Sequence, residues 1–382
     1  MTVKDKINYI SKYINSKGFI FKNELIGELY LSLKSRPFVI LCGCPGCGKT
    51  SLAKMFAEAS GATEGNGRFC TVNAQRYRAN DSSVIGNVKT DGKFYAEPAG
   101  EFIKNACENP SKPYFLCIDD MNSAICENYM YPILSSMQSR HFDENGIYTA
   151  DNLLSKFDFA SDKDSYRQYG NIFFPRNLYI IGCTNNDEFS YQLTKRIIDN
   201  AAVIELPYND IVPNFEITSD YEPLNLNNDF FEADYITIAD CKEEHDYITV
   251  LCSEYKAINN TVKYVNSQIS HRTMQSIVFF SLYNREYELI ESSHATDFII
   301  FSHILPRIDG SGMYMKSVLS SVFKVCMKYD DSSYDINPDS SVRMHKAASG
   351  SSCRYKKSAV KLSQMMRGYE EYGFASYWNK QC

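Results

Sequence analysis

The residues best suited to chemistry form a glycine-rich segment that follows an apolar run at 38–42. The segment fits the pattern G-x-x-x-x-G-K-[ST], with Lys49 and Thr50 at the last two positions. Glycines let consecutive backbone N–H groups turn toward phosphate oxygens, with the positive end of the next helix behind them. We therefore expect Lys49 to reach the β- and γ-phosphates of a nucleotide and Thr50 to bind Mg²⁺. The expected phosphate-binding residues are Gly43, Cys44, Pro45, Gly46, Cys47, Gly48, Lys49, Thr50 and Ser51.

The alternative for this segment is a glycine-rich turn that binds nothing. The apolar run before it and the helical pattern after it, at 51–59, argue against that alternative, because a phosphate loop needs both.

Two acidic residues, Asp119 and Asp120, end a second apolar run at 114–118. Many buried strands end in an acid, but this one follows Lys49 by about 70 residues, which favours a nucleotide-bound Mg²⁺. Asp119 would hold the metal through water, and Asp120 would orient or deprotonate the attacking water. A third apolar run ends in Asn185, whose amide could bond the attacking water or the γ-phosphate without adding negative charge.

The composition narrows the class of protein. The 382 residues are 44% hydrophobic, enough for about two domains, and the net charge of -6 gives no sign of binding nucleic acid by charge alone. Thirteen scattered cysteines without a signal peptide indicate reduced thiols in the cytoplasm. We expect no zinc at Cys42, Cys44 and Cys47, because a metal there would block the nucleotide, and we expect no membrane segment.

The elements that must position these residues alternate between strands and helices. Residues 1–35 predict two amphipathic helices, and 36–208 predict a nucleotide-binding core. This alternation favours a three-layer α/β fold around a parallel sheet. The expected strands are 38–42, 69–72, 114–120, 177–185 and 202–206, and the expected helices are 51–59, 98–106, 122–138 and 193–199. Residues 140–176 are expected to form a surface insertion.

Composition changes after Pro207, which predicts an acidic linker at 209–227 and a mainly α-helical domain at 228–382. A run without acidic residues, 340–368, carries seven Lys and Arg side chains. It is either a patch for DNA, RNA or an acidic partner, or a solvated helix face with the loop at 347–352, and we favour the second interpretation.

With these motifs in view, the chain resembles the AAA+ motor subunits of the McrB type, from restriction systems that pair a nucleotide-driven ring with a nuclease. The resemblance lies in the approach to the phosphate loop, the acidic strand with the Met-Asn after it, and the asparagine strand. Two further segments look like lid-domain signatures of a single-ring McrB-like subfamily. The quoted segments are 30–41, 117–122, 182–188, 304–308 and 373–378.

The resemblance implies a P-loop AAA+ core with a helical lid, assembled into a hexameric ring with nucleotide between subunits. It implies that Asn185 is the first sensor, that Asp187 orients residues at the subunit boundary, and that Arg272 is the lid arginine that senses the γ-phosphate. A surface arginine on a helix is the alternative for Arg272.

Three positions depart from the family pattern. Asp120 stands where a longer Glu is usual, and a carboxylate displaced by about 1 Å can cost about a hundredfold in rate. Ile125 and Asn200 stand where the subfamily has arginines. An arginine supplied by a neighbouring subunit stabilises the transition state and raises the rate of phosphoryl transfer by a factor of about 10³–10⁵. Arg196 is the nearest candidate for that arginine.

We therefore expect an ATP- or GTP-hydrolysing ring that uses Mg²⁺ and drives a separately encoded McrC-like nuclease. This chain shows no nuclease constellation, and about 36 residues precede its first core strand, so we expect the partner to contact DNA. The alternative is a nucleotide-binding assembly module with little hydrolysis. A small-molecule kinase fits less well, because a lid of about 150 residues is unusual for one.

Overall fold

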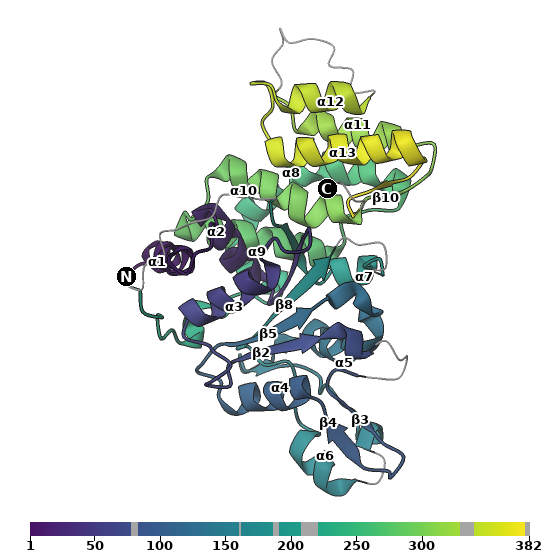
Figure 1. Ribbon diagram of the computed structural model, residues 1–382. Coiled ribbons are helices and arrows are strands. Elements are labelled where there is room, and N and C mark those ends of the chain that lie inside the picture. The colour runs from purple at the N-terminus through teal and green to yellow at the C-terminus, as the bar shows by residue number, and fades with distance from the viewer. Residues whose placement is uncertain (78–82, 160–161, 186–190, 208–220, 329–339, 379–382) are drawn as a thin grey trace. The chain divides into compact units, whose positions relative to one another are not determined.

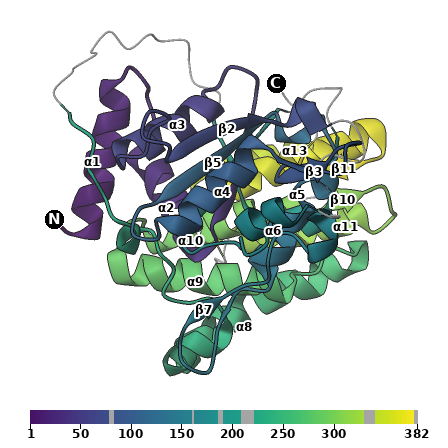
Figure 2. The ribbon, with the colours of Figure 1, turned by 90° about the horizontal axis from the view of Figure 1, so that it is seen from below.

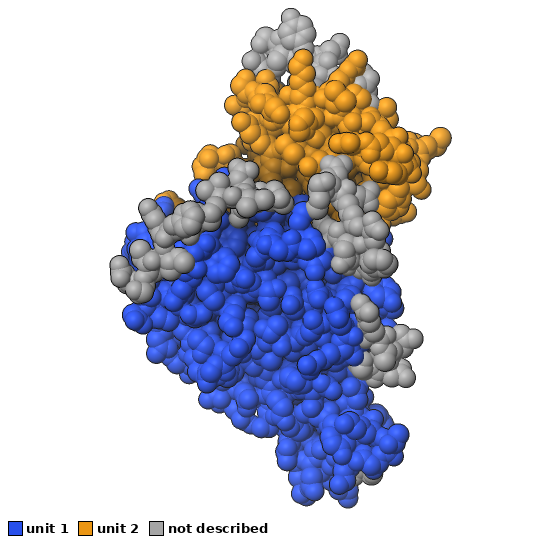
Figure 3. Space-filling view, in the orientation of Figure 1, with its two compact units in different colours: residues 1–240 blue, residues 241–382 orange. Residues whose placement is uncertain are grey.

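The computed structural model describes residues 1–77, 83–159, 162–185, 191–207, 221–328 and 340–378 (Figure 1). The chain divides into two compact units, residues 1–240 and 241–382 (Figure 3). No helix among the described residues is both long enough and apolar enough to cross a membrane.

A five-stranded parallel sheet forms the centre of the first unit. Its order is β2-β5-β8-β1-β9, so each sequential pair of strands is joined by a crossover. The middle strands are buried along nearly their whole length, as expected for a sheet covered on both faces. The predicted α/β fold is therefore confirmed. The strands are β1 (Phe38–Gly43), β2 (Phe69–Asn73), β5 (Tyr114–Asp119), β8 (Leu178–Asn185) and β9 (Ala202–Glu205).

Helices pack along this sheet. Two N-terminal helices, α1 (Val3–Ser16) and α2 (Asn23–Ser35), form as expected, and α2 contacts β1. Thr2 and Asp5 form a capping box at the start of α1, which satisfies backbone N–H groups there. Figure 2 shows β2 and β5 side by side with α4 (Pro98–Glu108) along them.

The helix predicted at 122–138 is shorter in the structure. A 3₁₀ turn at Met121–Ser123 comes first, and α5 spans Cys126–Gln138. The reason is that Ala124 and Ile125 have extended backbones, with φ and ψ of -132° and 167° and of -72° and 101°, so the turn cannot continue directly into α5. The side-chain amide of Asn122 also donates to the Asn185 carbonyl at 2.8 Å, which ties this turn to β8.

Residues 140–176 form more than a surface loop. Phe159 and Phe174 are at most 1% exposed, so this segment contributes to a core. The ring of Phe94 lies 4.9 Å from that of Phe159, which joins the segment to a small hairpin. The short elements here are β3 (Gly86–Val88), β4 (Phe94–Ala96), β6 (His141–Phe142), β7 (Tyr148–Thr149) and α6 (Lys163–Tyr169).

A segment at 228–234, which we name the strap, packs with the first unit, although the sequence placed residues from 228 onward in the second domain. Phe231 is fully buried beside the rings of Phe56 on α3 (Lys49–Ala59) and Phe115 on β5. The boundary between the two units therefore lies after residue 240 and not at the predicted position 228, because these aromatic side chains fill the core next to the sheet.

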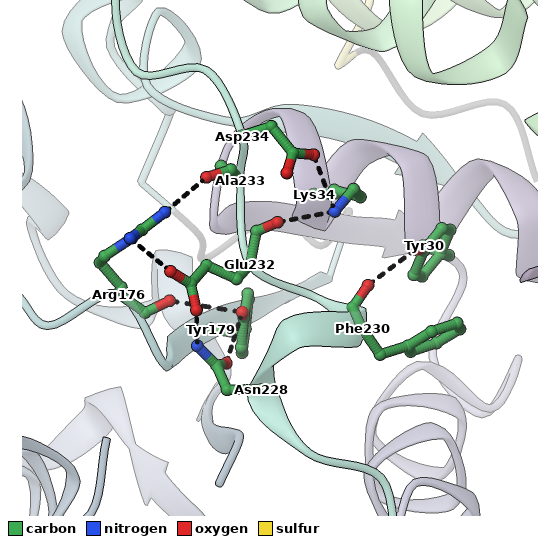
Figure 4. Close-up of polar contacts among 9 residues, drawn as sticks. All are labelled: Tyr30, Lys34, Arg176, Tyr179, Asn228, Phe230, Glu232, Ala233 and Asp234. Carbon is green, nitrogen blue, oxygen red and sulfur yellow. Dashed lines mark hydrogen bonds and ion pairs between the residues drawn. The ribbon is translucent and has the colours of Figure 1, made fainter. Parts of the chain in front are cut away.

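Polar contacts hold the strap on both sides (Figure 4). The buried Lys34 ammonium donates to the Glu232 carbonyl at 2.6 Å and pairs with Asp234 at 3.2 Å. On the other side, Arg176 pairs with the Glu232 carboxylate at 2.5 Å, and Tyr179 donates to the Asn228 side chain at 2.8 Å. The strap is therefore bound to both α2 and β8.

The second unit is mainly helical, as expected, and α11, α12 and α13 pack together within it (Figure 1). Its helices are α8 (His245–Val262), α9 (His271–Tyr287), α10 (Ser292–Ile299), α11 (Met315–Val325), α12 (Ser341–Ala348) and α13 (Lys356–Tyr372).

Several cations of the 340–368 run have partners inside this unit. Lys357 and Lys361 lie over the rings of Phe301 and Tyr377, at 4.6 and 4.2 Å from their centroids. Arg367 pairs with Glu371 at 2.7 Å. These contacts favour a structural use of the run over a binding patch.

Candidate functional site

The glycine-rich segment forms a tight loop between β1 and α3 (Lys49–Ala59). Gly43, Gly46 and Gly48 have φ values of 145°, 80° and 93°, which other residues rarely adopt. Gly48 is the N-cap of α3, and no side chain caps the first N–H groups of that helix. These donors and the helix dipole make the loop suited to an anion such as phosphate.

Lys49 is the first residue of α3, and its side chain turns back to this loop. The residue is 6% exposed, and its ammonium donates to the carbonyls of Gly43 at 3.0 Å and Cys44 at 2.9 Å. A buried ammonium needs such acceptors, because removing a charge from water without partners is costly. A phosphate group in the loop would compete with these carbonyls for the same positive charge.

The register of the sheet brings the ends of its strands together at one edge. Asn73 on β2 pairs with Asp119 on β5, and Gly43 on β1 pairs with Asn185 on β8. This is the edge from which α3 begins, so the polar strand ends lie at the phosphate loop.

Thr50 connects the loop helix to the acidic strand. Its hydroxyl donates to Oδ1 of Asp119 at 2.9 Å. A hydroxyl and one carboxylate fit Mg²⁺, which usually binds one or two protein oxygens together with water and substrate phosphates. No cluster of three or more His, Cys, Asp or Glu side chains suited to a metal occurs in the part of the chain that is described.

Both oxygens of the Asp120 carboxylate accept hydrogen bonds from amides. The Asn185 side chain donates to one at 2.7 Å, and the Gln75 side chain donates to the other at 3.2 Å. Asn185 is itself positioned by Asn122, whose side chain bonds its backbone on both sides. The structure thus brings Asp119, Asp120 and Asn185 to the edge where Lys49 and Thr50 lie.

Gln75 was not expected at the site from the sequence, and Asn122, although part of the quoted segment 117–122, was given no role of its own. Gln75 follows β2 in a short 3₁₀ turn, and its N–H bonds the side chain of Asn73. The available signal was position: a polar residue just past the end of a strand next to the acidic strand belongs at the same edge of the sheet.

The positions expected to carry an arginine differ from one another. Ile125 is 40% exposed, whereas Asn200 is fully buried and donates to the Arg196 carbonyl at 2.7 Å. Arg36 fills the space beside Asn200, donating to its side chain at 3.4 Å. Position 200 is therefore a structural one in this chain.

Arg196 lies in the short helix α7 (Lys195–Ile198), with its guanidinium 5.4 Å from the centre of the Tyr131 ring. Arg272 lies in the first turn of α9, in the second unit. Asp187 falls outside the described residues. The roles expected for these three residues stay predictions.

Comparison with known families bears on both halves of the chain. Residues 39–204 match the sequence model of the AAA family, described as "ATPase family associated with various cellular activities", and this match runs from β1 to β9. Residues 219–374 match a second model, described as "Domain of unknown function (DUF8727)", which includes the strap.

Among solved structures, the chain is similar to one described as a "putative ATPase" from Cytophaga hutchinsonii ATCC 33406. The two share 13% identity, with a TM-score of 0.43, over 80% of this chain and 87% of the other. A search of curated protein sequences finds no match.

Proposed function

From the AAA ATPase domain at residues 39–204, we propose that this chain is an Mg²⁺-dependent nucleoside triphosphatase that hydrolyses ATP or GTP. The observation that carries the proposal is the 2.9 Å hydrogen bond between Thr50 and Asp119, which joins the phosphate loop to the acidic strand end. A hydroxyl and a carboxylate in contact, next to a loop with uncapped N–H groups, are the groups that a nucleotide with bound Mg²⁺ requires.

The chemistry assigned to each residue follows from its position. Lys49 would leave the Gly43 and Cys44 carbonyls and bind phosphate oxygens instead. Bound Mg²⁺ would neutralise charge on the transferred phosphate, and Thr50 and Asp119 would hold it. Asp120 would accept a proton from the attacking water or orient it, while Asn185 holds the carboxylate in place.

The same proposal includes assembly and a partner. The McrB-like sequence motifs support a cytoplasmic ring, a hexamer in the related systems, that drives a McrC-like nuclease. DNA would be contacted through that partner. Arg196 and Arg272 would complete the nucleotide site, from a neighbouring subunit and from the lid respectively.

The first experiment measures the affinity of the purified chain for fluorescent ATP and GTP analogues. Lys49→Ala is expected to weaken binding by about 10- to 150-fold, because charge-assisted hydrogen bonds contribute about 1.5–3 kcal/mol. Lys54→Ala is the matched control, since Lys54 lies on the same helix but its side chain is 49% exposed, and its pairing with Glu64 is on the surface. Equal affinity of Lys49→Ala and the unmodified chain would contradict the proposal.

The second experiment tests the ring and its partner. Light scattering with and without nucleotide measures assembly, and phosphate release is measured with and without the product of the adjacent gene. The proposal expects assembly on nucleotide binding and faster phosphate release with the partner. A chain that stays monomeric with saturating nucleotide, or whose neighbour encodes no nuclease, would contradict this part of the proposal.

Two observations favour the alternative, an assembly module with little hydrolysis. The short Asp120 carboxylate already has an amide on each oxygen, and an exposed apolar side chain, Ile125, stands where an arginine was expected. If Asp120→Glu raises turnover while assembly stays the same, that result supports the interpretation of the chain as an assembly module with little hydrolysis of its own.

A further inference from the structure

The phosphate loop contains two cysteines, Cys44 and Cys47, in a C-x-x-C spacing that the phosphate-loop pattern does not require. The N–H of Cys47 donates to the Cys44 carbonyl at 3.3 Å, and Gly46 has a φ of 80°. Proline at the second position and positive φ at the third identify a type II turn. The two cysteines are therefore the first and last residues of one β-turn.

This turn brings the two cysteines to a separation that suits a disulfide. The Cα atoms at the ends of a β-turn lie within about 7 Å of each other, and disulfides join Cα atoms about 4.4–6.8 Å apart. Cys44 and Cys47 are both partly exposed, and Pro45 and Gly46 between them are exposed. The turn is therefore open to a small oxidant in solution.

The Cys47 sulfur also lies next to the charge that the loop uses. Its Sγ is 3.7 Å from the ammonium of Lys49, and a Cβ placed on Gly43 would come within 3.0 Å of it. An oxidant that reacts at Cys47 would therefore act beside the charge that is expected to bind phosphate. Cys44, at the other end of the same turn, is placed to react with Cys47 second.

Another pair of sulfurs serves as a comparison. Cys117 and Cys183 have their sulfurs 4.0 Å apart on neighbouring strands, but both residues are buried in the sheet. Their mutual hydrogen bond and burial raise the pKa of Cys117. Proximity alone therefore does not make a reactive pair, because thiolate character and access are also needed.

We infer that Cys44 and Cys47 are a reversible redox pair, and that a hydroperoxide converts them to a disulfide that closes the phosphate loop to nucleotide. The Cys47 thiolate attacks one peroxide oxygen, the O–O bond breaks, and Cys47 becomes a sulfenic acid while the other oxygen leaves as water after taking up a proton. The Cys44 thiol then attacks that sulfur, forming the S–S bond and breaking the S–O bond, and its proton leaves with the second water. Two thiols and hydrogen peroxide give one disulfide and two waters, and a thiol reductant reverses the change by exchange.

The disulfide acts on the loop through two contacts. It draws the Cys47 sulfur toward Cys44 and away from Lys49 and Gly43, and it ties together the two ends of the turn whose N–H groups would wrap a phosphate. Formation of the disulfide does not depend on the proposed function, whereas its effect on nucleotide binding does.

The test treats the full chain with hydrogen peroxide, blocks the remaining thiols by alkylation, and maps the peptides without reduction. We expect a linkage between Cys44 and Cys47, and an affinity for fluorescent nucleotide that falls at least about tenfold and returns with dithiothreitol. Saturating nucleotide added before the peroxide should slow the linkage. Absence of the 44–47 linkage, with or without a linkage at Cys117 and Cys183, would overturn the inference.

Variants separate the two chemical steps, and each variant is compared with itself before and after treatment with peroxide. Cys47→Ser should have the same nucleotide affinity after peroxide as it had before. Cys44→Ser should accumulate a sulfenic acid at Cys47, which a dimedone probe traps. Cys70→Ser is the matched control, because Cys70 is half-buried on β2 outside the loop, and it should respond as the unmodified chain does. If the disulfide forms without loss of nucleotide affinity, the inference that it closes the phosphate loop is wrong. If the reduced chain binds no nucleotide, the proposed function is refuted instead, and the peptide map still shows whether the disulfide between Cys44 and Cys47 forms.

Discussion

Asp120 has both a left-handed backbone and a carboxylate that accepts hydrogen bonds on both oxygens. Its backbone is left-handed, with φ of 48° and ψ of 42°, and its carboxylate is held by two amides from neighbouring strand ends. Non-glycine residues in this conformation usually lie where the surrounding structure demands it. Here the conformation turns the carboxylate toward Asn185 and Gln75, at the edge that carries the phosphate loop.

Replacing Asp120 by Asn keeps the size of the side chain but removes its ability to accept a proton. We expect turnover to fall about 100-fold or more, as for loss of a general base, while nucleotide affinity is nearly unchanged. Phosphate release and binding of a fluorescent nucleotide, measured on the same preparation, separate the two quantities. Turnover equal to that of the unmodified chain would remove Asp120 from the chemistry.

Thr50 is expected to affect the metal rather than the base of the nucleotide. Thr50→Val keeps the shape of the side chain but loses the hydroxyl that contacts Asp119, so the Mg²⁺ concentration for half-maximal turnover should rise about tenfold. Thr71→Val on β2 is the control, because that side chain is exposed and outside the site. An unchanged Mg²⁺ requirement in Thr50→Val would exclude this metal ligand.

The sequence predicted Lys49, Thr50 and Asp119 because their local patterns are specific and the ends of parallel strands meet at one edge. It did not reveal Gln75, since a glutamine in a polar stretch looks like any turn residue until the neighbouring strand is known. Nor did it show that Asn200 is buried, because a helix of four residues gives no periodicity to read.

The strap shows what a short element can contribute to stability. Phe231 is fully buried, with its ring centre within 6 Å of the rings of Phe56, Phe115 and Tyr179. Phe231→Ala should lower the free energy of unfolding by about 3–5 kcal/mol, because the cavity cannot fully collapse between a sheet and a helix. Urea denaturation followed by circular dichroism measures this. Phe157→Ala is the control, at 91% exposed, and a similar loss in both variants would contradict the packing described.

The polar contacts of the strap should contribute unequally to the free energy of unfolding. Lys34 has a side chain that is 3% exposed, whereas its partner Asp234 is 59% exposed. Asp234→Asn should therefore change stability by less than about 1 kcal/mol. Lys34→Ala should cost more, because it also removes the donor to the Glu232 carbonyl and leaves a gap beside the strap. Denaturation midpoints of the two variants, compared under the same conditions, test the order.

At the level of elements, the apolar runs predicted the alternation of strands and helices, but they did not predict where α5 begins. The pattern from 122 onward looks helical without a break, and only the structure shows that Asn122 is used to hold Asn185. A tertiary contact decided that boundary. Sequence patterns report which face of an element is apolar, and they do not report which side chain is needed elsewhere.

At the scale of the whole chain, the change in composition after Pro207 correctly indicated a second, helical part but placed its start too early by comparison with the compact units. The units divide between residues 240 and 241, because Phe230 and Phe231 join the core of the first unit. The acidic residues around them continue the composition of the predicted linker at 209–227, so composition did not mark this segment as part of the first unit. Composition averages over a window, so it cannot show that two aromatic side chains within that window are buried.

This boundary predicts how fragments behave. A fragment of residues 1–240 keeps both strap phenylalanines, whereas a fragment of residues 1–227 lacks them. Losing two buried phenylalanines, at about 3–5 kcal/mol each, is comparable to the whole stability of a typical domain, about 5–15 kcal/mol. We therefore expect 1–240 to unfold cooperatively in urea and 1–227 to be largely unfolded or aggregated. Circular dichroism and size-exclusion chromatography of the two fragments check this, with 1–240 carrying Phe231→Ala as an intermediate case. If 1–227 were as stable as 1–240, the strap would not belong to the first unit's core.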